Sequence, residues 1–139
     1  AAPALLPLEQ GRMNGPKGEP MAKILITEDE DSLRTFVARA LRMDGHETVE
    51  APDGAAGLDA LTDGGFDLLL SDIRMPVMDG IELAHKASAA HPALKILLMT
   101  GYAEQRERAD DLTSKIVDVV SKPFSLPDIR RAVATALAA

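Results

Sequence analysis

Short apolar runs alternate with amphipathic stretches from residue 21 to the end of the chain. Three of the runs, ILIT, DLLLS and KILLM, are almost continuously apolar, which is typical of strands that are covered on both faces. Five runs in all predict β-strands, at Lys23–Thr27, Glu47–Ala51, Phe66–Ser71, Leu94–Met99 and Lys115–Val120.

Helical periodicity occupies the intervals between these runs. From Asp31 to Met43 the apolar residues, Phe36 and Leu41 among them, recur on one face of a helix, and Gly45 is suited to end that helix. The other predicted helices are Gly54–Leu61, Ile81–Ala89, Glu104–Leu112 and Ser125–Ala138. Five βα units with right-handed crossovers predict an α/β fold with a doubly wound parallel sheet.

Polar residues with reactive side chains follow four of the predicted strands. Ligands of such sheets bind beyond the carboxyl ends of the strands, where the strand order reverses. Alone, an Asp after a strand is usually a cap or turn residue and a Lys is usually a solvated surface charge. Their coincidence at one edge of the sheet indicates a functional site made of Glu28, Asp29, Asp72, Thr100 and Lys122.

Three of these residues are acids, and their mutual repulsion has to be offset. Two carboxylates about 4 Å apart repel by about 4 kcal/mol at an effective dielectric constant near 20, and Lys122 neutralises only one of them. Either a carboxyl pKa rises or a hard cation binds, and Mg²⁺ suits oxygen ligands and phosphate chemistry best. Asp72 is then placed to accept a phosphoryl group, with Mg²⁺, Lys122 and the Thr100 hydroxyl each stabilising one phosphoryl oxygen.

The segments ILITEDED, LLLSDIRMPVMDG, LLMTG and VVSKPF closely resemble the receiver domain of bacterial two-component response regulators. The resemblance covers residues 21–139 and implies a flavodoxin-like, five-stranded parallel sheet of order 2-1-3-4-5. It also implies that a histidine kinase or histidine phosphotransferase phosphorylates Asp72.

The resemblance assigns roles to the remaining site residues. Glu28 and Asp29 become the acidic pair at the Mg²⁺ ion, which Asp72 and the backbone carbonyl of Arg74 also bind. Thr100 becomes the switch hydroxyl, and Lys122 contacts the phosphoryl oxygens and precedes a proline bond that is often cis in the family.

Two positions depart from the family pattern. Glu28 stands where Asp is commoner, and Val119 stands where many receivers carry an aromatic residue three positions before the lysine. Tyr102 is either a substitute for that aromatic residue or an ordinary surface residue. Two other functions remain to be weighed: a phosphatase, although Arg74 occupies the place of its second acid, and an unphosphorylated scaffold, which the complete set of site residues disfavours.

The two ends of the chain differ from the rest. Residues 1–20 hold four of the nine prolines and show no helical or strand period, so they are interpreted as an upstream extension or a cloning remnant, with the receiver domain beginning at Met21. Leu137-Ala138-Ala139 is either a fraying helix end or a tail similar to those read by the unfoldase–protease ClpXP. The domain resembles single-domain alphaproteobacterial cell-cycle regulators that control ClpXP-dependent proteolysis, with phosphate shuttling or another target as the alternative.

Composition excludes several other classes. The chain has no cysteine, which rules out a disulfide scaffold and Cys-ligated metals and fits a cytoplasmic protein. Its net charge of −7 disfavours nucleic acid as a partner. No apolar run approaches the roughly 18 residues that a membrane span needs, so we expect no membrane partner. From the resemblance to receiver domains we expect a regulatory module and not a turnover enzyme.

Overall fold

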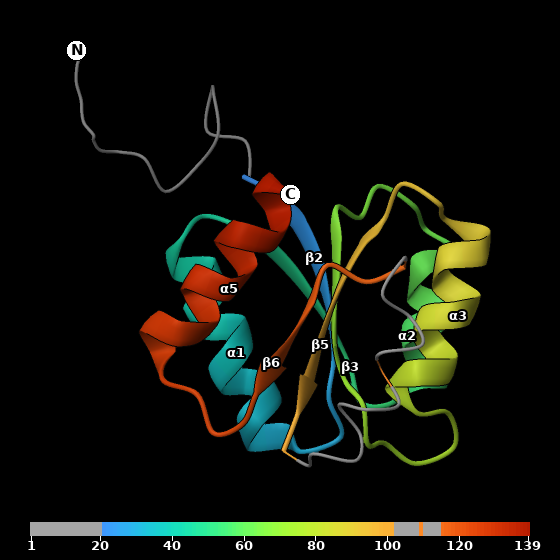
Figure 1. The fold of residues 1–139 in the computed structure, drawn as a ribbon, viewed down its shortest axis with the longest axis horizontal. Coiled ribbons are helices and arrows are strands. Elements are labelled where there is room, and N and C mark those ends of the chain that lie inside the picture. The colour runs from blue at the N-terminus through green and yellow to red at the C-terminus, as the bar shows by residue number, and fades with distance from the viewer. Residues whose placement is uncertain (1–20, 102–108, 110–114) are drawn as a thin grey trace.

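The computed structural model describes residues 21–101, 109 and 115–139, and its centre is a parallel five-stranded sheet (Figure 1). The strands lie in the order β3-β2-β4-β5-β6, which is 2-1-3-4-5 when they are counted along the chain. This confirms the predicted doubly wound topology. The strands are β2 (Lys23–Thr27), β3 (Glu47–Ala51), β4 (Leu68–Asp72), β5 (Lys95–Thr100) and β6 (Asp118–Ser121).

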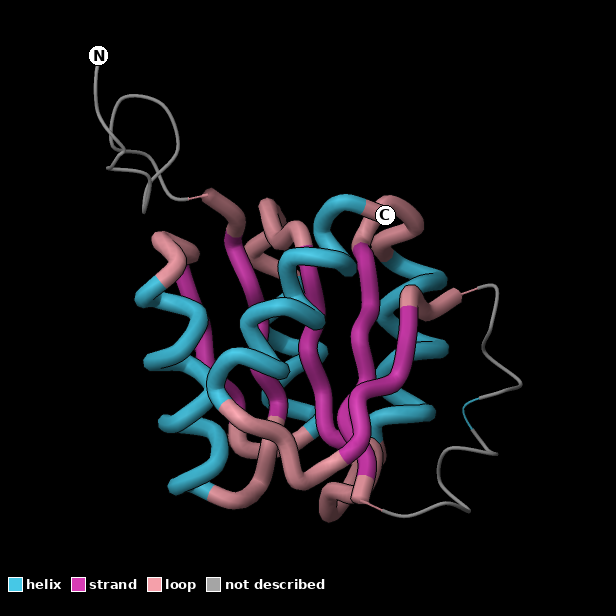
Figure 2. The backbone as a smooth tube through the Cα atoms, turned by 60° about the vertical axis from the view of Figure 1, so that its left-hand side comes forward, coloured by secondary structure: helices cyan, strands magenta, loops and turns pink. Residues whose placement is uncertain are grey.

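Helices cover both faces of the sheet. α1 (Asp31–Met43) and α5 (Leu126–Ala138) pack on one face, and α2 (Gly54–Leu61) and α3 (Gly80–Ala90) pack on the other (Figures 1 and 2). None of the described helices is long and apolar enough to cross a bilayer.

Alternate residues of the central strands enter two separate cores. In β2, Ile24 and Ile26 belong to the core under α1 and α5, whereas Leu25 belongs to the core under α2 and α3. All three side chains are fully buried. Burial on both faces is the physical reason that this strand is continuously apolar in sequence.

The predicted element bounds shift by a few residues in the second half of the domain. β4, β5 and β6 begin one to three residues later than predicted, because flanking apolar residues such as Phe66 pack against the core outside the paired segment. α3 begins one residue earlier, at Gly80, and Ser125 caps α5 rather than belonging to it. The predicted helix Glu104–Leu112 lies outside the described residues, apart from the buried Ala109.

The prediction that Phe36 lies on the buried face of α1 is wrong. Phe36 is 38% exposed, whereas Val37, Ala38 and Leu41 are fully buried. Since successive helical residues are about 100° apart, a buried arc centred between Val37 and Leu41 includes Ala38 and leaves Phe36 at its edge.

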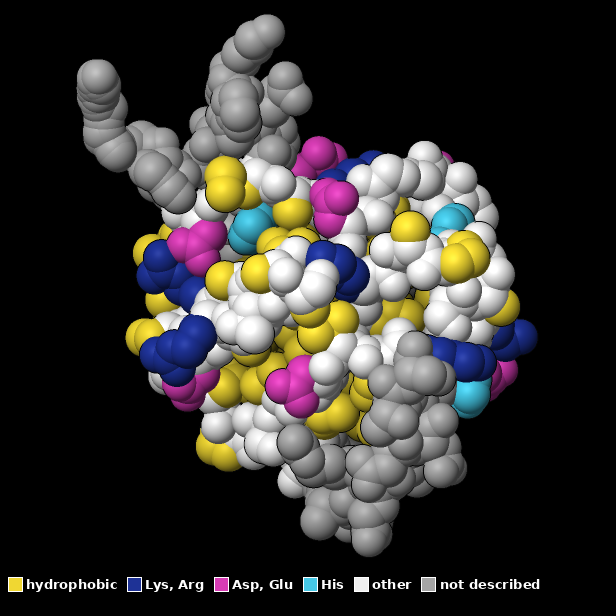
Figure 3. Space-filling view, turned by 45° about the horizontal axis from the view of Figure 1, so that its top comes forward, with side chains coloured by type: hydrophobic (Ala, Val, Ile, Leu, Met, Phe, Trp, Pro, Cys, Tyr) yellow, Lys and Arg dark blue, Asp and Glu magenta, His cyan; other side chains and the backbone are white. Residues whose placement is uncertain are grey.

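The surface mixes charge and apolar side chains. Basic and acidic residues are interspersed on the face drawn in Figure 3, and hydrophobic side chains lie between them. The large hydrophobic residues with the most exposure are Met21, Phe36, Met43 and Val77.

Two glycines lie at helix ends, and Gly45 ends α1 as predicted. Gly45 follows α1 with a positive φ of 89°, and its N–H donates to the Arg42 carbonyl, which closes the helix. Gly80 opens α3 and donates its N–H to the carbonyl of Ile73 at 2.7 Å. A Cβ atom at Gly80 would lie 2.2 Å from the backbone oxygen of Asp72, so α3 can approach the end of β4 only without a side chain there.

We expect Gly80→Ala to lower the free energy of unfolding by about 1–3 kcal/mol, as overpacking does. The gain in helix propensity from alanine is about 1 kcal/mol or less, and it cannot offset a clash with backbone atoms that have no rotamer to change. Urea unfolding measures the difference. Gly101→Ala is the control, because its Cβ would lie 3.8 Å from Lys122 Cβ, in ordinary contact. Equal stability of the two variants would contradict the close approach.

Candidate phosphoacceptor and metal site

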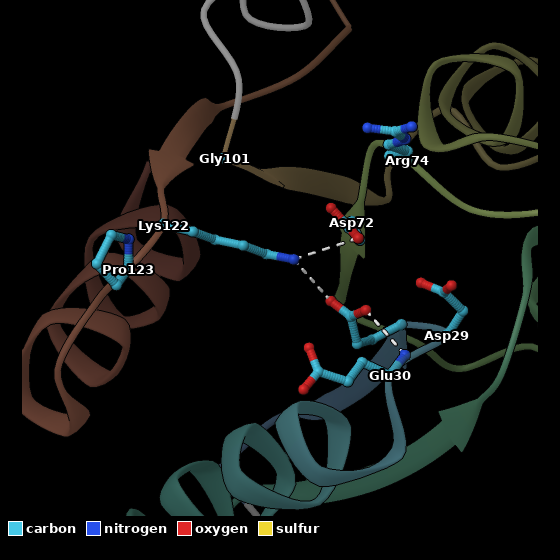
Figure 4. Close-up of a pocket in the computed structure, with 8 residues that line it drawn as sticks. Asp29, Glu30, Asp72, Arg74, Gly101, Lys122 and Pro123 are labelled. Atoms are coloured by element: carbon cyan, nitrogen blue, oxygen red, sulfur yellow. Dashed lines mark hydrogen bonds and ion pairs between the residues drawn. The ribbon is translucent and has the colours of Figure 1, made fainter.

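The predicted site residues come together at the carboxyl edge of the sheet, where Figure 4 shows Asp29, Asp72 and Lys122. Glu28 directly follows β2, Asp72 is the last residue of β4, and Thr100 is the last residue of β5. The sequence had placed Asp72 and Thr100 just after their strands; both lie inside them, paired with the neighbouring strand. Lys122 directly follows β6, and its backbone N–H donates to the Thr100 carbonyl at 2.7 Å.

The acids and Lys122 border a cavity of about 730 Å³. The cavity is polar on the side of the acids, and the side chain of Lys122 reaches across it towards them (Figure 4). Its lining residues are Glu28, Asp29, Glu30, Asp72, Arg74, Gly101, Lys122 and Pro123. The bond between Lys122 and Pro123 is cis, as the sequence resemblance implied.

Three carboxylates form the core of the site. One oxygen from each of Glu28, Asp29 and Asp72 lies within 4.8 Å of the others. Glu28 is 1% exposed and Asp72 is 6% exposed, while Asp29 lies open to solvent. Charges this close repel strongly when water is excluded, so the cluster needs a cation.

Lys122 supplies part of that positive charge. Its Nζ lies 3.0 Å from Glu28 Oε1 and 3.2 Å from Asp72 Oδ2. Burial by itself lowers the pKa of Lys122, but the two carboxylates outweigh it, so the pKa is raised above its ordinary value. The amine therefore remains charged at neutral pH and bridges two of the three acids.

Ionisation of the two buried acids, Glu28 and Asp72, remains unfavourable despite the charge of Lys122, and both carboxyl pKa values are raised. Burial raises the pKa of Asp72, and this outweighs the opposing effects of Lys122 and of the Arg74 backbone N–H. Burial also raises the pKa of Glu28, and the nearby charge of Asp72 adds to it. A cation bound between these acids would favour their ionised forms.

Glu28 is held at both carboxylate oxygens. Oε1 accepts from Lys122, and Oε2 accepts from the backbone N–H of Glu30 at 3.0 Å. By contrast, no side chain or backbone group in the described part of the chain donates a hydrogen bond to the Asp29 carboxylate. Asp29 is thus the acid with the most freedom to bind a metal directly.

The donor set fits a hard divalent cation. Clustered carboxylate oxygens, one of them open to solvent, are ligands that Mg²⁺ prefers, and Mg²⁺ usually retains several waters beside one or two carboxylates. The structure therefore supports a metal site at the predicted residues.

The acidic residues at the start of α1 do not cap the helix with their side chains. Glu30 occupies the position before the first helical residue and makes no side-chain cap. Asp31 is the first helical residue, and its exposed carboxylate pairs with Arg34 at 2.7 Å. Asp31 still places a negative charge in the first turn, where it suits the helix dipole.

Other sequence expectations concern the switch residues. Thr100 is 2% exposed at the end of β5, next to Gly101, which lines the cavity. Val119, which replaces the aromatic residue of many receivers, lies in β6 and is half-buried against the core under α2 and α3. Tyr102 lies outside the described residues.

Sequence reasoning missed Arg34 altogether. Its Nη1 donates to the Glu28 carbonyl at 2.7 Å, and its side chain is only 15% exposed. An arginine in the first turns of a helix gives no sequence signal of this kind, since its partner depends on how the preceding loop folds.

A doubly wound sheet with clustered acids and a lysine at its carboxyl edge is the arrangement of a signalling receiver domain. The chain matches the response regulator receiver domain family over residues 24–134 and belongs to that family.

The chain is 40% identical over 109 residues to the response regulator receiver protein CpdR of Brucella abortus. The aligned segment covers 78% of this chain and 91% of CpdR. It is 31% identical over 111 residues to sporulation initiation phosphotransferase F of Bacillus subtilis, covering 80% of this chain and 90% of that protein. It spans only 25% of another relative, the regulatory protein AtoC of Escherichia coli, at 36% identity over 83% of this chain.

Solved structures show the same fold. The chemotaxis response regulator CheY4 of Vibrio cholerae superposes with a TM-score of 0.76 at 26% identity, covering 84% of this chain and 98% of CheY4. The response regulator TrrA of Thermotoga maritima, solved in complex with Mg²⁺ and BeF, superposes with a TM-score of 0.75 at 28% identity over 84% of this chain and 99% of TrrA.

We expect Asp72→Asn to raise the melting temperature at pH 7 in EDTA. Because the pKa of Asp72 is raised on folding, the folded wild type loses stability as the pH rises above the ordinary value of 3.8, whereas asparagine has no proton to lose. The difference should shrink as the pH falls towards 4. Thermal unfolding across this pH range measures it.

Asp59→Asn serves as the control, because Asp59 is an exposed residue of α2. It removes the same charge from the chain without touching the cluster. If Asp72→Asn melts no higher than the wild type at pH 7, the carboxylate is not destabilised by its surroundings.

Proposed function

We propose that this protein is a phosphorylation-controlled switch whose phosphoacceptor is Asp72. One observation carries the proposal: the Asp72 carboxylate ends β4 inside the cavity, 3.2 Å from Lys122 Nζ and grouped with Glu28 and Asp29. A nucleophilic carboxylate, a fixed ammonium and two further acids are the parts that phosphoryl transfer to aspartate requires.

The donor is a phosphohistidine of a histidine kinase or histidine phosphotransferase. An oxygen of Asp72 forms a new bond to phosphorus as the phosphorus–nitrogen bond to the donor imidazole breaks, and that bonding pair remains on the imidazole nitrogen. Lys122, whose Nζ lies 3.2 Å from Asp72 Oδ2, contacts an equatorial phosphoryl oxygen. The Thr100 hydroxyl stabilises another oxygen from the end of β5.

Mg²⁺ is the proposed cofactor, held by Glu28, Asp29, Asp72 and the backbone carbonyl of Arg74. It would supply positive charge to the phosphoryl oxygens during transfer. The three clustered acids support this assignment, and so does the Mg²⁺–BeF complex of the T. maritima relative. Glu28, whose oxygens are already bonded, would act on the ion less directly than Asp29.

The phosphorylated protein is the product, so this is a switch and not a turnover enzyme. Arg74 stands two residues after Asp72, where a phosphatase of the aspartyl-phosphate type needs an acid for its second step. Phosphorylation would change the balance of pre-existing conformations around Thr100 and Lys122, whose backbones are joined by a hydrogen bond across β5 and the end of β6.

The downstream role that we favour is control of ClpXP-dependent proteolysis in the bacterial cell cycle, with the unphosphorylated form engaging the protease. The support is the 40% identity to CpdR over nearly all of that protein. A second candidate is a phosphate shuttle, supported by the 31% identity to sporulation initiation phosphotransferase F.

Labelling with acetyl phosphate and Mg²⁺ tests the phosphoacceptor. We expect Asp72→Asn to abolish labelling. In the described part of the chain, Lys122 pairs only with Asp72 and Glu28, and both carboxylate oxygens of Glu28 already accept hydrogen bonds. Excess EDTA should also abolish it in the wild type. Intact-protein mass spectrometry gives the phosphorylated fraction.

Asp59→Asn should label like the wild type. Normal labelling of Asp72→Asn would refute the assignment. Steady turnover of a phosphate ester by the wild type would favour a phosphatase instead, and failure of the wild type to bind Mg²⁺ would favour an unphosphorylated scaffold.

A pull-down tests the downstream role. We expect Asp72→Ala protein and unphosphorylated wild type to retain the ClpX unfoldase equally, and acetyl-phosphate treatment to reduce retention several-fold for the wild type only. Retention that ignores phosphorylation, or its absence in both forms, would count against the proteolysis role. Phosphate passing from the wild type to a histidine phosphotransferase would then favour the shuttle.

A further inference from the structure

We propose that Arg34 is a positioning residue for the divalent-cation site, because it fixes the backbone that carries Glu28 and Asp29. The proposal rests on the proposed function only in assuming that these acids hold the ion.

Arg34 joins three segments around the acidic loop. Its Nη1 donates to the Glu28 carbonyl at 2.7 Å, and its Nη2 lies 2.7 Å from Asp31 Oδ1. Its Nε lies 3.4 Å from Glu50 Oε1 in β3. One guanidinium thus ties the end of β2 to the start of α1 and to the neighbouring strand, a use of its rigid donor fork that lysine cannot reproduce.

The peptide groups of Glu28 are held on both sides. The Glu28 N–H donates to the Ala51 carbonyl at 3.2 Å, and the Glu28 carbonyl accepts from Arg34. That carbonyl belongs to the peptide unit that leads into Asp29, so its direction sets where the Asp29 side chain begins.

Asp29 depends on this backbone more than its neighbours do. Glu28 is anchored through both carboxylate oxygens, and Asp72 is paired with Lys122, but within residues 21–101 and 115–139 no donor holds the Asp29 carboxylate. A metal ligand without a side-chain anchor is placed by its main chain alone. Substituting a group that orients a metal ligand typically weakens metal affinity by about tenfold or more.

Helix stability does not explain an arginine at this place. A positive charge near the N-terminus of α1 opposes the helix dipole, and Asp31 offsets it only through an ion pair in which the carboxylate is 86% exposed. Exposed pairs contribute about 1 kcal/mol or less. The shielded bond to the Glu28 carbonyl is the contact that distinguishes Arg34 from the other arginines of α1.

Arg42 provides a matched control on the same helix. It also approaches Glu50, at 3.9 Å, and donates to Thr48 Oγ1, but its side chain is 49% exposed and makes no contact with the acidic loop. Equal substitutions at Arg34 and Arg42 therefore remove the same charge and the same neighbour in β3. They differ in the bond to the Glu28 carbonyl and in two exposed contacts, Arg34 with Asp31 and Arg42 with Thr48.

The decisive measurement is the Mg²⁺ dissociation constant of the full-length protein, obtained by isothermal titration calorimetry. We expect Arg34→Gln to weaken Mg²⁺ binding about tenfold and Arg42→Gln to leave it within twofold of the wild type. Labelling by acetyl phosphate at saturating Mg²⁺ should stay near the wild-type rate, with only the Mg²⁺ requirement raised. Mg²⁺ affinity within twofold of the wild type in Arg34→Gln would overturn the proposal.

Arg34→Lys keeps the test decisive if Arg34→Gln does not fold. It retains the charge but not the fork, and we expect it to bind Mg²⁺ more weakly than Arg42→Lys; equal affinities would overturn the proposal. In EDTA, amide hydrogen exchange at Asp29 and Glu30 should be faster in the Arg34 variant than in the Arg42 variant. A merely structural role would lower the melting temperature without either change.

The two levels of inference fail differently. If the wild type binds Mg²⁺ but Asp72 is not labelled, the proposed function is wrong while the Arg34 comparison still stands. If the wild type binds no Mg²⁺, the proposed function fails, and unchanged hydrogen exchange in the Arg34 variant would refute the positioning role as well.

Discussion

The contact of Lys122 with both Glu28 and Asp72 is the interaction on which the site depends. Two buried carboxylates and a third beside them cannot be held within 4.8 Å by backbone geometry without an offsetting charge. One ammonium at 3.0 and 3.2 Å offsets part of that repulsion, and the rest would be offset by a cation bound at the cluster. This remaining repulsion is the physical basis of the phosphoacceptor function that we propose.

The scaffold brings these charges together through apolar burial. β2 and β4 are buried on both faces; Glu28 directly follows β2, and β4 ends at Asp72. Close backbone approaches keep that edge compact: a Cβ on Gly57 would lie 2.4 Å from the methyl carbon of Thr27, just before Glu28. The hydrophobic effect thus supplies the free energy that holds like charges close.

Glu28 shows how one added methylene group changes such a site. Its longer side chain reaches both Lys122 and the Glu30 N–H, so it serves as an anchor within the cluster. In the described part of the chain no group donates a hydrogen bond to the Asp29 carboxylate, so under our proposal Asp29 would be the more direct metal ligand. The backbone bond from Arg34 would then matter for metal binding because it helps to place Asp29.

Hydrophobic period and residue chemistry are local properties, so the sequence could predict the described strands and helices, the parallel sheet, and the acids, hydroxyl and lysine at its edge. Both β2 and α1 have the predicted bounds. The contact of Lys122 with Glu28 across 94 positions of the chain, the partial exposure of Phe36 and the pairing of Asp31 with Arg34 could be read only from the folded structure. Those outcomes depend on strand register, helix rotation and loop direction, which packing sets over distances that no local pattern encodes.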